Sequence, residues 1–141
     1  MKIVTVTGID KSGKSTIISE LFKRTNGLVY IIDRDISTWH FFNELLERSK
    51  DNHLYKKQYN AKLKDFRKFI DLSILLTIDE ETWLKRCKEH KEPSLVGNLS
   101  FLEHQKELVK YFTKAHYPNV LKLNTSELTV NECINEILKR I

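Results

Sequence analysis

The sequence predicts an α/β fold, a three-layer arrangement in which a small parallel sheet of about four strands is flanked by helices. Short β-branched and aliphatic runs, typical of buried strands, occupy residues 2–7, 28–32, 72–78 and 120–124. Segments with helical spacing of apolar residues separate these runs, and such alternation is typical of βαβ units. The 141 residues, 40% of them hydrophobic, fit a single domain spanning 1–141.

The first strand, residues 2–7, leads through a glycine-containing loop into a predicted helix over 14–24. Four apolar residues of this helix recur at helical spacing: Ile17, Ile18, Leu21 and Phe22. Asn26-Gly27 is a typical helix stop, and the strand at 28–32 follows it. Residues 36–50 and 53–70 predict two more helices, the second with a basic face.

The second half of the chain repeats this alternation. The strand at 72–78 precedes a short helix over 80–90, a lid-like loop at about 88–100 and a helix over 101–116. The last strand, 120–124, is followed by an amphipathic helix, for which Thr129 is the expected cap.

Composition excludes several classes of protein. The net charge of +5 favours anionic ligands such as nucleotides or nucleic acid, although basic and acidic residues mix along the chain. Cys87 and Cys133 fit no metal-ligand spacing, so we expect reduced thiols on helices. The apolar run at the N-terminus is too short for a signal peptide, and no segment is long and apolar enough to span a membrane. These two observations predict a cytoplasmic protein with no membrane partner.

Residues 8–15, GIDKSGKS, match the phosphate-loop pattern G-x-x-x-x-G-K-[ST] at every fixed position. Glycines let successive backbone N–H groups turn toward a phosphate, Lys14 reaches the β- and γ-phosphates, and the Ser15 hydroxyl ligates Mg²⁺. The loop follows a strand and opens a helix whose dipole favours an anion. The sequence therefore predicts a P-loop NTPase fold that binds ATP with Mg²⁺.

A P-loop enzyme also needs an acidic residue at the end of a neighbouring strand. Asp33 and Asp79 both follow predicted strands, whose carboxyl ends are where open α/β sheets bind ligands. Asp33 is the better candidate, either as a Mg²⁺ ligand through water or as a base, and Arg34 beside it suits an acceptor phosphate. Asp79, with Glu80 and Glu81, is better explained as a helix start.

These motifs resemble those of thymidylate kinases, a family of P-loop nucleoside monophosphate kinases. The loop TGIDKSGKST resembles the family pattern G-x-D-x-x-G-K-S-T, which includes Asp10 and Thr16. IIDRDIST resembles its strand-end motif D-R-[YHF]-x-x-S. The segments DLSILLTIDEETWLKRCKEH and LVKYFTKAHYPNVLKLNTSELTVNECINEIL resemble its later strands and helices more weakly.

The resemblance implies residue roles in phosphoryl transfer. Asp10 lies near the acceptor sugar hydroxyl, and Lys11 stabilises the transferring phosphoryl in members that have no lid arginine. Asp33 and Arg34 lie at the metal and the acceptor phosphate. The resemblance also implies which loop residues bind the nucleotide: Gly8, Asp10, Lys11, Ser12, Gly13, Lys14, Ser15 and Thr16. Family members are often dimers, so a homodimer is a candidate assembly.

The chain departs from the family between the loop and Asp33, where members place an extra strand and helices that enclose the monophosphate. This chain lacks that insert or keeps a remnant of it in residues 39–70, and Asp35 replaces an aromatic residue. Three functions therefore stay open: transfer to a small nucleotide, transfer to a hydroxyl of a nucleoside or of DNA or RNA with Asp33 or Asp35 as base, and nucleotide binding without transfer.

Overall fold

The computed structural model describes residues 1–34, 65, 67–90, 100–114 and 119–141. Its elements, in chain order, are β1 (Lys2–Thr7), α1 (Lys14–Arg24), β2 (Val29–Asp33), β3 (Leu72–Thr77), α4 (Glu80–Glu89), α5 (Ser100–Lys114), β4 (Val120–Asn124) and α6 (Val130–Leu138). The two helices expected within 36–50 and 53–70 lie outside the described residues, apart from a short stretch near residue 67, and so does most of the lid-like loop.

The four described strands form one parallel sheet in the order β2-β1-β3-β4. β1 pairs with β2 on one side, Val4 opposite Ile31, and with β3 on the other, Val4 opposite Leu72. All six residues of β3 are buried, as expected of a central strand. The predicted α/β class with a small parallel sheet is confirmed.

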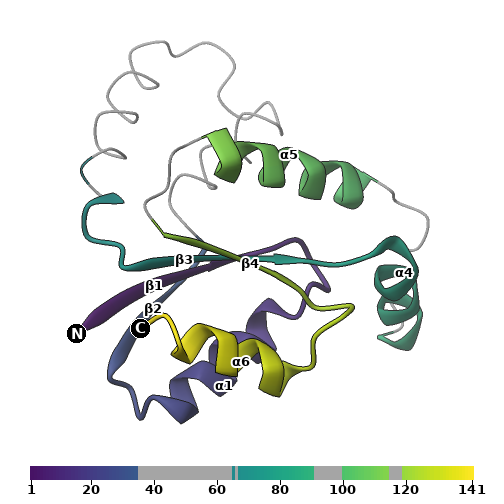
Figure 1. The fold of residues 1–141 in the computed structure, drawn as a ribbon. Helices are drawn as coiled ribbons and strands as arrows, with labels where there is room; N and C mark the ends of the chain where they lie inside the picture. Colours follow the sequence, from purple (N-terminus) through teal and green to yellow (C-terminus); the bar gives the residue numbers. More distant parts are fainter. Residues whose placement is uncertain (35–64, 66, 91–99, 115–118) are drawn as a thin grey trace.

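Helices cover both faces of the sheet (Figure 1). α1 and α6 lie side by side against one face, where Ile74 and Leu76 of β3 join their apolar residues in one core cluster. α5 covers the other face, where Leu75 packs with Trp83 and Leu108 in a second cluster. α4 stands beyond the carboxyl ends of the strands, so it borders the loops that follow them.

The helix termini follow local signals. Thr129 caps α6 in a capping box: its hydroxyl accepts from the Glu132 N–H, and the Glu132 carboxylate accepts from the Thr129 N–H. The expected cap is thus confirmed. α1 ends at Arg24, and the chain then turns through left-handed Asn26 (φ 51°) and Gly27 (φ 73°).

The apolar residues at helical spacing in α1 are not equally buried. Ile17 and Leu21 are buried and Ile18 is partly buried, but the Phe22 side chain is 58% exposed. β2 is an edge strand, and among the described residues no element covers the groove that Phe22 borders with Gly27 and Tyr30. The second strand is displaced by one residue from its predicted range, 28–32. It covers Val29–Asp33, and Leu28 is exposed.

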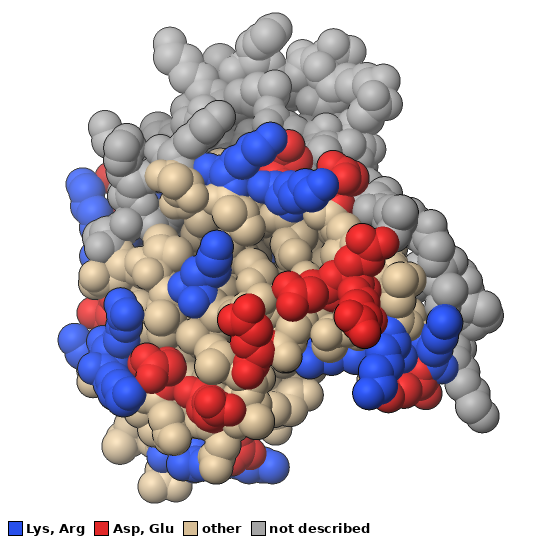
Figure 2. Space-filling model, turned by 45° about the vertical axis from the view of Figure 1, so that its right-hand side comes forward, with Lys and Arg blue, Asp and Glu red and all other residues tan. Residues whose placement is uncertain are grey.

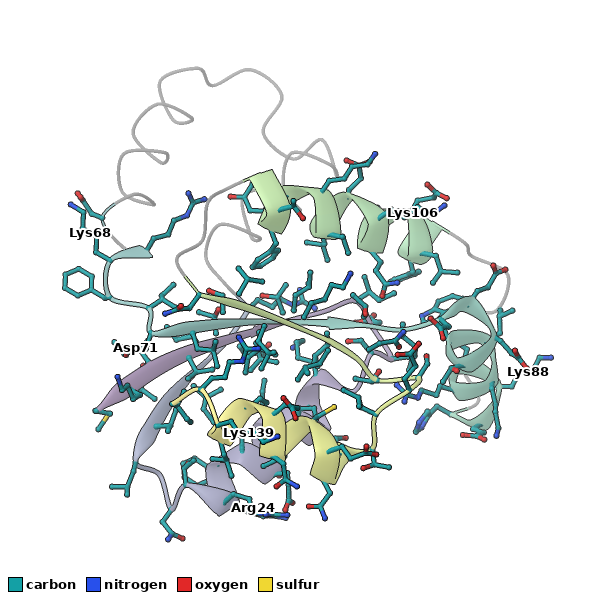
Figure 3. All side chains as sticks on the ribbon, in the orientation of Figure 1. Arg24, Lys68, Asp71, Lys88, Lys106 and Lys139 are labelled. Carbon is teal, nitrogen blue, oxygen red and sulfur yellow. The ribbon has the colours of Figure 1, made fainter. Side chains whose placement is uncertain are left out.

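Figure 2 shows basic and acidic side chains interspersed over the face of the molecule that it presents. The side chains that fill the space between the sheet and its helix layers are seen in Figure 3, where Asp71 and Lys88 mark opposite ends of the sheet. Among the described helices, none has the length and apolarity to cross a membrane.

Candidate functional site

The candidate site lies at the carboxyl ends of the parallel strands. Because every described pairing is parallel, the segments that follow Thr7, Asp33, Thr77 and Asn124 emerge at the same edge of the sheet. In the order β2-β1-β3-β4, the connection from β1 runs to β2 on one side, and the connection from β3 runs to β4 on the other. Such a switch point is where open α/β sheets bind ligands.

The loop between β1 and α1, residues 8–13, wraps onto the first turn of α1. Gly13 takes a left-handed conformation (φ 92°) at the N-cap, which favours glycine. Gly8 is required for space instead: a Cβ there would lie 2.4 Å from Ser12 Oγ and 3.1 Å from Leu76 Cβ. The second left-handed residue of the loop is Lys11, with φ 67°.

A cavity of about 730 Å³ opens beside this loop, within the size range of small-molecule sites. Its described lining carries the cations Lys11, Lys14, Arg34 and Arg86 against one carboxylate, Asp10. Other lining residues come from α1, α4 and the segment leading into α6: Ser15, Thr16, Ile17, His90, Thr125, Leu128, Thr129, Val130 and Cys133. The excess of cations suits an anionic ligand.

Two of the predicted site residues form an ion pair. The Lys14 ammonium donates to the Asp33 carboxylate across the end of β2. The Lys14 side chain is 13% exposed, whereas Asp33 is 61% exposed. The Asp33 carboxylate is therefore the direct partner of the Lys14 ammonium.

Arg34 and Asp10 also meet at the cavity, with 4.0 Å between an Arg34 guanidinium nitrogen and Asp10 Oδ1. Arg34 has a left-handed backbone (φ 69°), and its N–H donates to the Val6 carbonyl at 2.9 Å. Lys11 and Arg34 thus both hold a conformation that costs a non-glycine residue free energy, and both line the cavity. Strained backbone of this kind concentrates at functional sites.

Three residues that the sequence analysis did not assign to the site hold the loop from outside. The Trp83 indole Nε1–H donates to the Asp10 carbonyl at 3.1 Å, and Arg86 donates to the Lys11 carbonyl at 2.8 Å. The Thr125 hydroxyl donates to the Ser12 carbonyl at 2.8 Å. Arg86 also donates to the Thr125 hydroxyl at 3.2 Å and the Thr125 carbonyl at 3.0 Å, which links two loops.

The sequence contains a signal that could have identified Thr125 as a site residue. Thr125 directly follows β4, so the strand-end argument that singled out Asp33 and Asp79 applies to it equally. Arg86 lies within the predicted helix over 80–90, and no motif distinguishes it there. Asp79 sits at the N-cap position of α4 and accepts from the Asn124 side chain at 3.1 Å, consistent with the helix-start interpretation.

The side of the cavity formed by α6 is less polar. Leu128, Val130 and Cys133 line it, and Cys133 is fully buried. Burial raises the pKa of the Cys133 thiol, and the neighbouring Glu132 carboxylate raises it further. Cys87 and Cys133 both lie on helices, as predicted, and they do not form a disulfide with each other. The cavity thus combines a cationic side with an apolar side.

The sequence predicts two protein ligands for Mg²⁺, one hydroxyl and one carboxylate. Among the described residues there is no cluster of three or more His, Cys, Asp or Glu side chains. The Ser15 hydroxyl and the Asp33 carboxylate are the predicted ligands, and Mg²⁺ is typically held by one or two such groups with phosphates and waters. Asp35, the alternative base, lies outside the described residues.

Comparisons with protein-family models, curated proteins and solved structures gave no match for this chain.

Proposed function

We propose that this chain is a P-loop phosphotransferase that moves the terminal phosphoryl group of ATP to a small nucleotide, in the manner of thymidylate and other nucleoside monophosphate kinases. One observation carries the proposal. The segment from Gly8 to Ser15, which matches the phosphate-loop pattern, runs from the central strand β1 to the N-terminus of α1 and borders a cation-rich cavity. Context of this kind distinguishes a phosphate loop from a chance match.

In this proposal the triphosphate lies along the loop toward the α1 N-terminus. The positive end of the α1 dipole and the backbone N–H groups of its first turn favour the anion, and Ser15 and Thr16 are exposed there. Lys14 must exchange its Asp33 partner for phosphate oxygens. Mg²⁺ bound with the phosphates would neutralise part of their charge, with Ser15 and Asp33 as its protein ligands.

The proposed step forms a bond between the γ-phosphorus and an acceptor oxygen, and it breaks the bond to the β,γ-bridging oxygen, so that ADP leaves with that electron pair. Little covalent chemistry falls to the protein, which positions the groups and stabilises charge. Lys11 and Lys14 flank the transferring group. Arg34, beside Asp10 at the cavity edge, binds the acceptor phosphate.

Transfer to a hydroxyl is the second candidate. The pairing of Asp10 with Arg34 favours it, because a carboxylate near the acceptor is the group that a hydroxyl acceptor needs as base, alongside Asp33 or Asp35. A polynucleotide acceptor would need a continuous basic track. The basic face predicted at residues 53–70 is the candidate for that track, and most of it lies outside the described residues.

The experiment is an acceptor screen with ATP-Mg²⁺. Ribo- and deoxyribonucleoside monophosphates, nucleosides and hydroxyl-ended oligonucleotides are each incubated with the protein, and ADP formation and phosphorylated product are measured. Lys14→Met serves as the inactive control. We expect product with at least one monophosphate. Transfer only to an oligonucleotide or a nucleoside would replace the first candidate by the second, and ATP binding without transfer to any acceptor would indicate a nucleotide-binding module.

A further inference from the structure

Three consecutive carbonyls of the loop accept hydrogen bonds from side chains that belong to other segments. Asp10 accepts from Trp83, Lys11 from Arg86, and Ser12 from Thr125. Trp83 and Arg86 lie three residues apart on α4, so they stand on the same helix face. The backbone of the loop is therefore held by residues at least 70 positions further along the chain than the loop itself.

These contacts fix the backbone of Lys11 in particular. The peptide before the Lys11 Cα carries the Asp10 carbonyl, and the peptide after it carries the Lys11 carbonyl. Because a peptide unit is planar, a hydrogen bond to its carbonyl fixes the orientation of the whole unit. Trp83 and Arg86 thus hold the two planes whose relative rotation is the φ and ψ of Lys11.

Lys11 needs such support. Its φ of 67° is left-handed, which costs a residue with a Cβ roughly 1–2 kcal/mol. Strained backbone persists only where the surroundings determine it. The donors are well placed for this, since Trp83 is fully buried and packs against Phe101 with 5.9 Å between ring centroids, while Arg86 is tied to Thr125 as well.

We infer that Trp83 and Arg86 are positioning residues: from one face of α4 they set the left-handed backbone of Lys11 and thereby the direction of its ammonium in the cavity. The consequence for transfer rests on the proposed function, in which Lys11 stabilises the transferring phosphoryl group. The backbone consequence does not, because it concerns the loop alone.

The kinetic test is a double-mutant cycle with Arg86→Gln and Lys11→Ala, using ATP-Mg²⁺ and the acceptor found in the screen. We expect Arg86→Gln to lower kcat about tenfold or more, because small misplacements of a charged group are costly, and to change the KM for ATP less than threefold. In the Lys11→Ala background the same substitution should change kcat less than twofold, because its target is gone. Equal factors in both backgrounds would overturn the inference.

The second measurement needs no turnover. Amide hydrogen exchange at residues 9–13 is compared in wild type, Arg86→Gln, Trp83→Phe and Lys85→Gln. Trp83→Phe keeps an aromatic ring but removes the donor, and Lys85→Gln removes an exposed cation from the same helix as a control. We expect roughly tenfold faster exchange in the loop for the first two variants, with β1 and β3 unchanged, and no change for the control.

The two measurements separate the claims. If no acceptor is phosphorylated but loop exchange rises in Arg86→Gln and Trp83→Phe, the proposed function fails and the positioning of Lys11 stands. If the wild type transfers phosphoryl groups but the loop exchanges at the same rate in all four proteins, the inference is wrong while the function holds. Arg86→Lys extends the test, because a lysine cannot bridge Lys11 and Thr125 as the guanidinium fork does, and it should restore little.

Discussion

Lys14 and Asp33 form an ion pair that joins the first residue of α1 to the last residue of β2. The pair holds the Lys14 ammonium at the cavity, where the side chain is largely shielded, while the Asp33 carboxylate faces solvent. In the proposed function, a phosphate that enters the loop competes with Asp33 for the same cation. The pair is therefore part of the binding equilibrium rather than a strong source of stability.

The Lys14 substitution should separate binding from folding. Lys14→Met should weaken ATP-Mg²⁺ binding roughly 10- to 100-fold, because it removes charge-assisted hydrogen bonds worth about 1.5–3 kcal/mol. The melting temperature should change little, since the partner is exposed. Isothermal titration calorimetry and thermal unfolding give the two values. Lys23→Met, which removes an exposed cation from the last turn of the same helix, is the control and should bind as the wild type does.

Gly8 should tolerate no side chain. Gly8→Ala places a Cβ 2.4 Å from Ser12 Oγ and 3.2 Å from the Leu76 carbonyl, so it should destabilise the fold by about 1–3 kcal/mol. Urea unfolding measures the change. Ser12→Ala alone should be nearly neutral, because the buried Ser12 hydroxyl has no hydrogen-bond partner among the described residues.

The double variant Gly8→Ala/Ser12→Ala makes the Gly8 prediction specific. It should recover part of the lost stability, because the closest clash is removed, but the contact with Leu76 remains. A double variant that is no more stable than Gly8→Ala alone would show that Ser12 is not the obstacle.

Asp71 should contribute to acid sensitivity. Its carboxylate accepts from the Ile3 N–H at 2.8 Å, and this bond, with Lys2 nearby, lowers the pKa of Asp71 below its usual value. The native state therefore binds the proton less readily than the unfolded chain does. The stabilisation is present above the usual carboxyl pKa and is lost as the pH falls through the lowered value.

The stability difference between wild type and Asp71→Asn should accordingly shrink between pH 6 and pH 3 in urea unfolding. Glu103→Gln, which removes an exposed carboxylate from α5, is the control. Asp71 lies at the far end of the sheet from α4 in Figure 3, so nucleotide binding at neutral pH should be the same in both proteins. A difference that stays constant with pH would contradict the assignment.

Cys133 should be a slow thiol that reports on the cavity. Burial raises its pKa, so less thiolate exists at a given pH, and the sulfur is fully shielded. We expect iodoacetamide to modify it at pH 7.5 far more slowly in the native protein than in urea, as followed by peptide mass spectrometry. Because Cys133 lines the cavity, ATP-Mg²⁺ should slow the native reaction further. Equal native rates with and without nucleotide would place the ligand elsewhere.

Much of the fold could be predicted because its signals are local. The run at 2–7, the helix from Lys14 to Arg24 and the Thr129 cap each depend on residues within a few positions of one another. The burial of Phe22 could not be predicted, because helical spacing shows which residues share a face, not whether another element covers that face. The described sheet ends at β2, so part of the apolar face of α1 has no covering element among the described residues.

The candidate site could be predicted only as far as its motif reaches. Lys14, Asp33 and Arg34 were found from spacing and strand ends, and the structure brings them together at one edge of the sheet. The donors that hold the loop were not found, since Trp83 and Thr125 meet it across 73 and 113 positions of sequence. Nothing in a phosphate-loop pattern specifies which distant side chains cap its carbonyls.

The distance along the chain between the loop and its supports has a consequence for synthesis. Residues 8–15 leave the ribosome before the residues that fix their carbonyls, which are 83, 86 and 125. A nascent chain that has reached α1 therefore carries the phosphate-loop motif but lacks the contacts that hold its backbone, and β1 cannot pair with β3 until residues 72–75 have emerged. Of the three supports, Thr125 emerges last, after β4. If the loop binds nucleotide as proposed, fragments that stop before Thr125 should bind it far more weakly than the complete fold does.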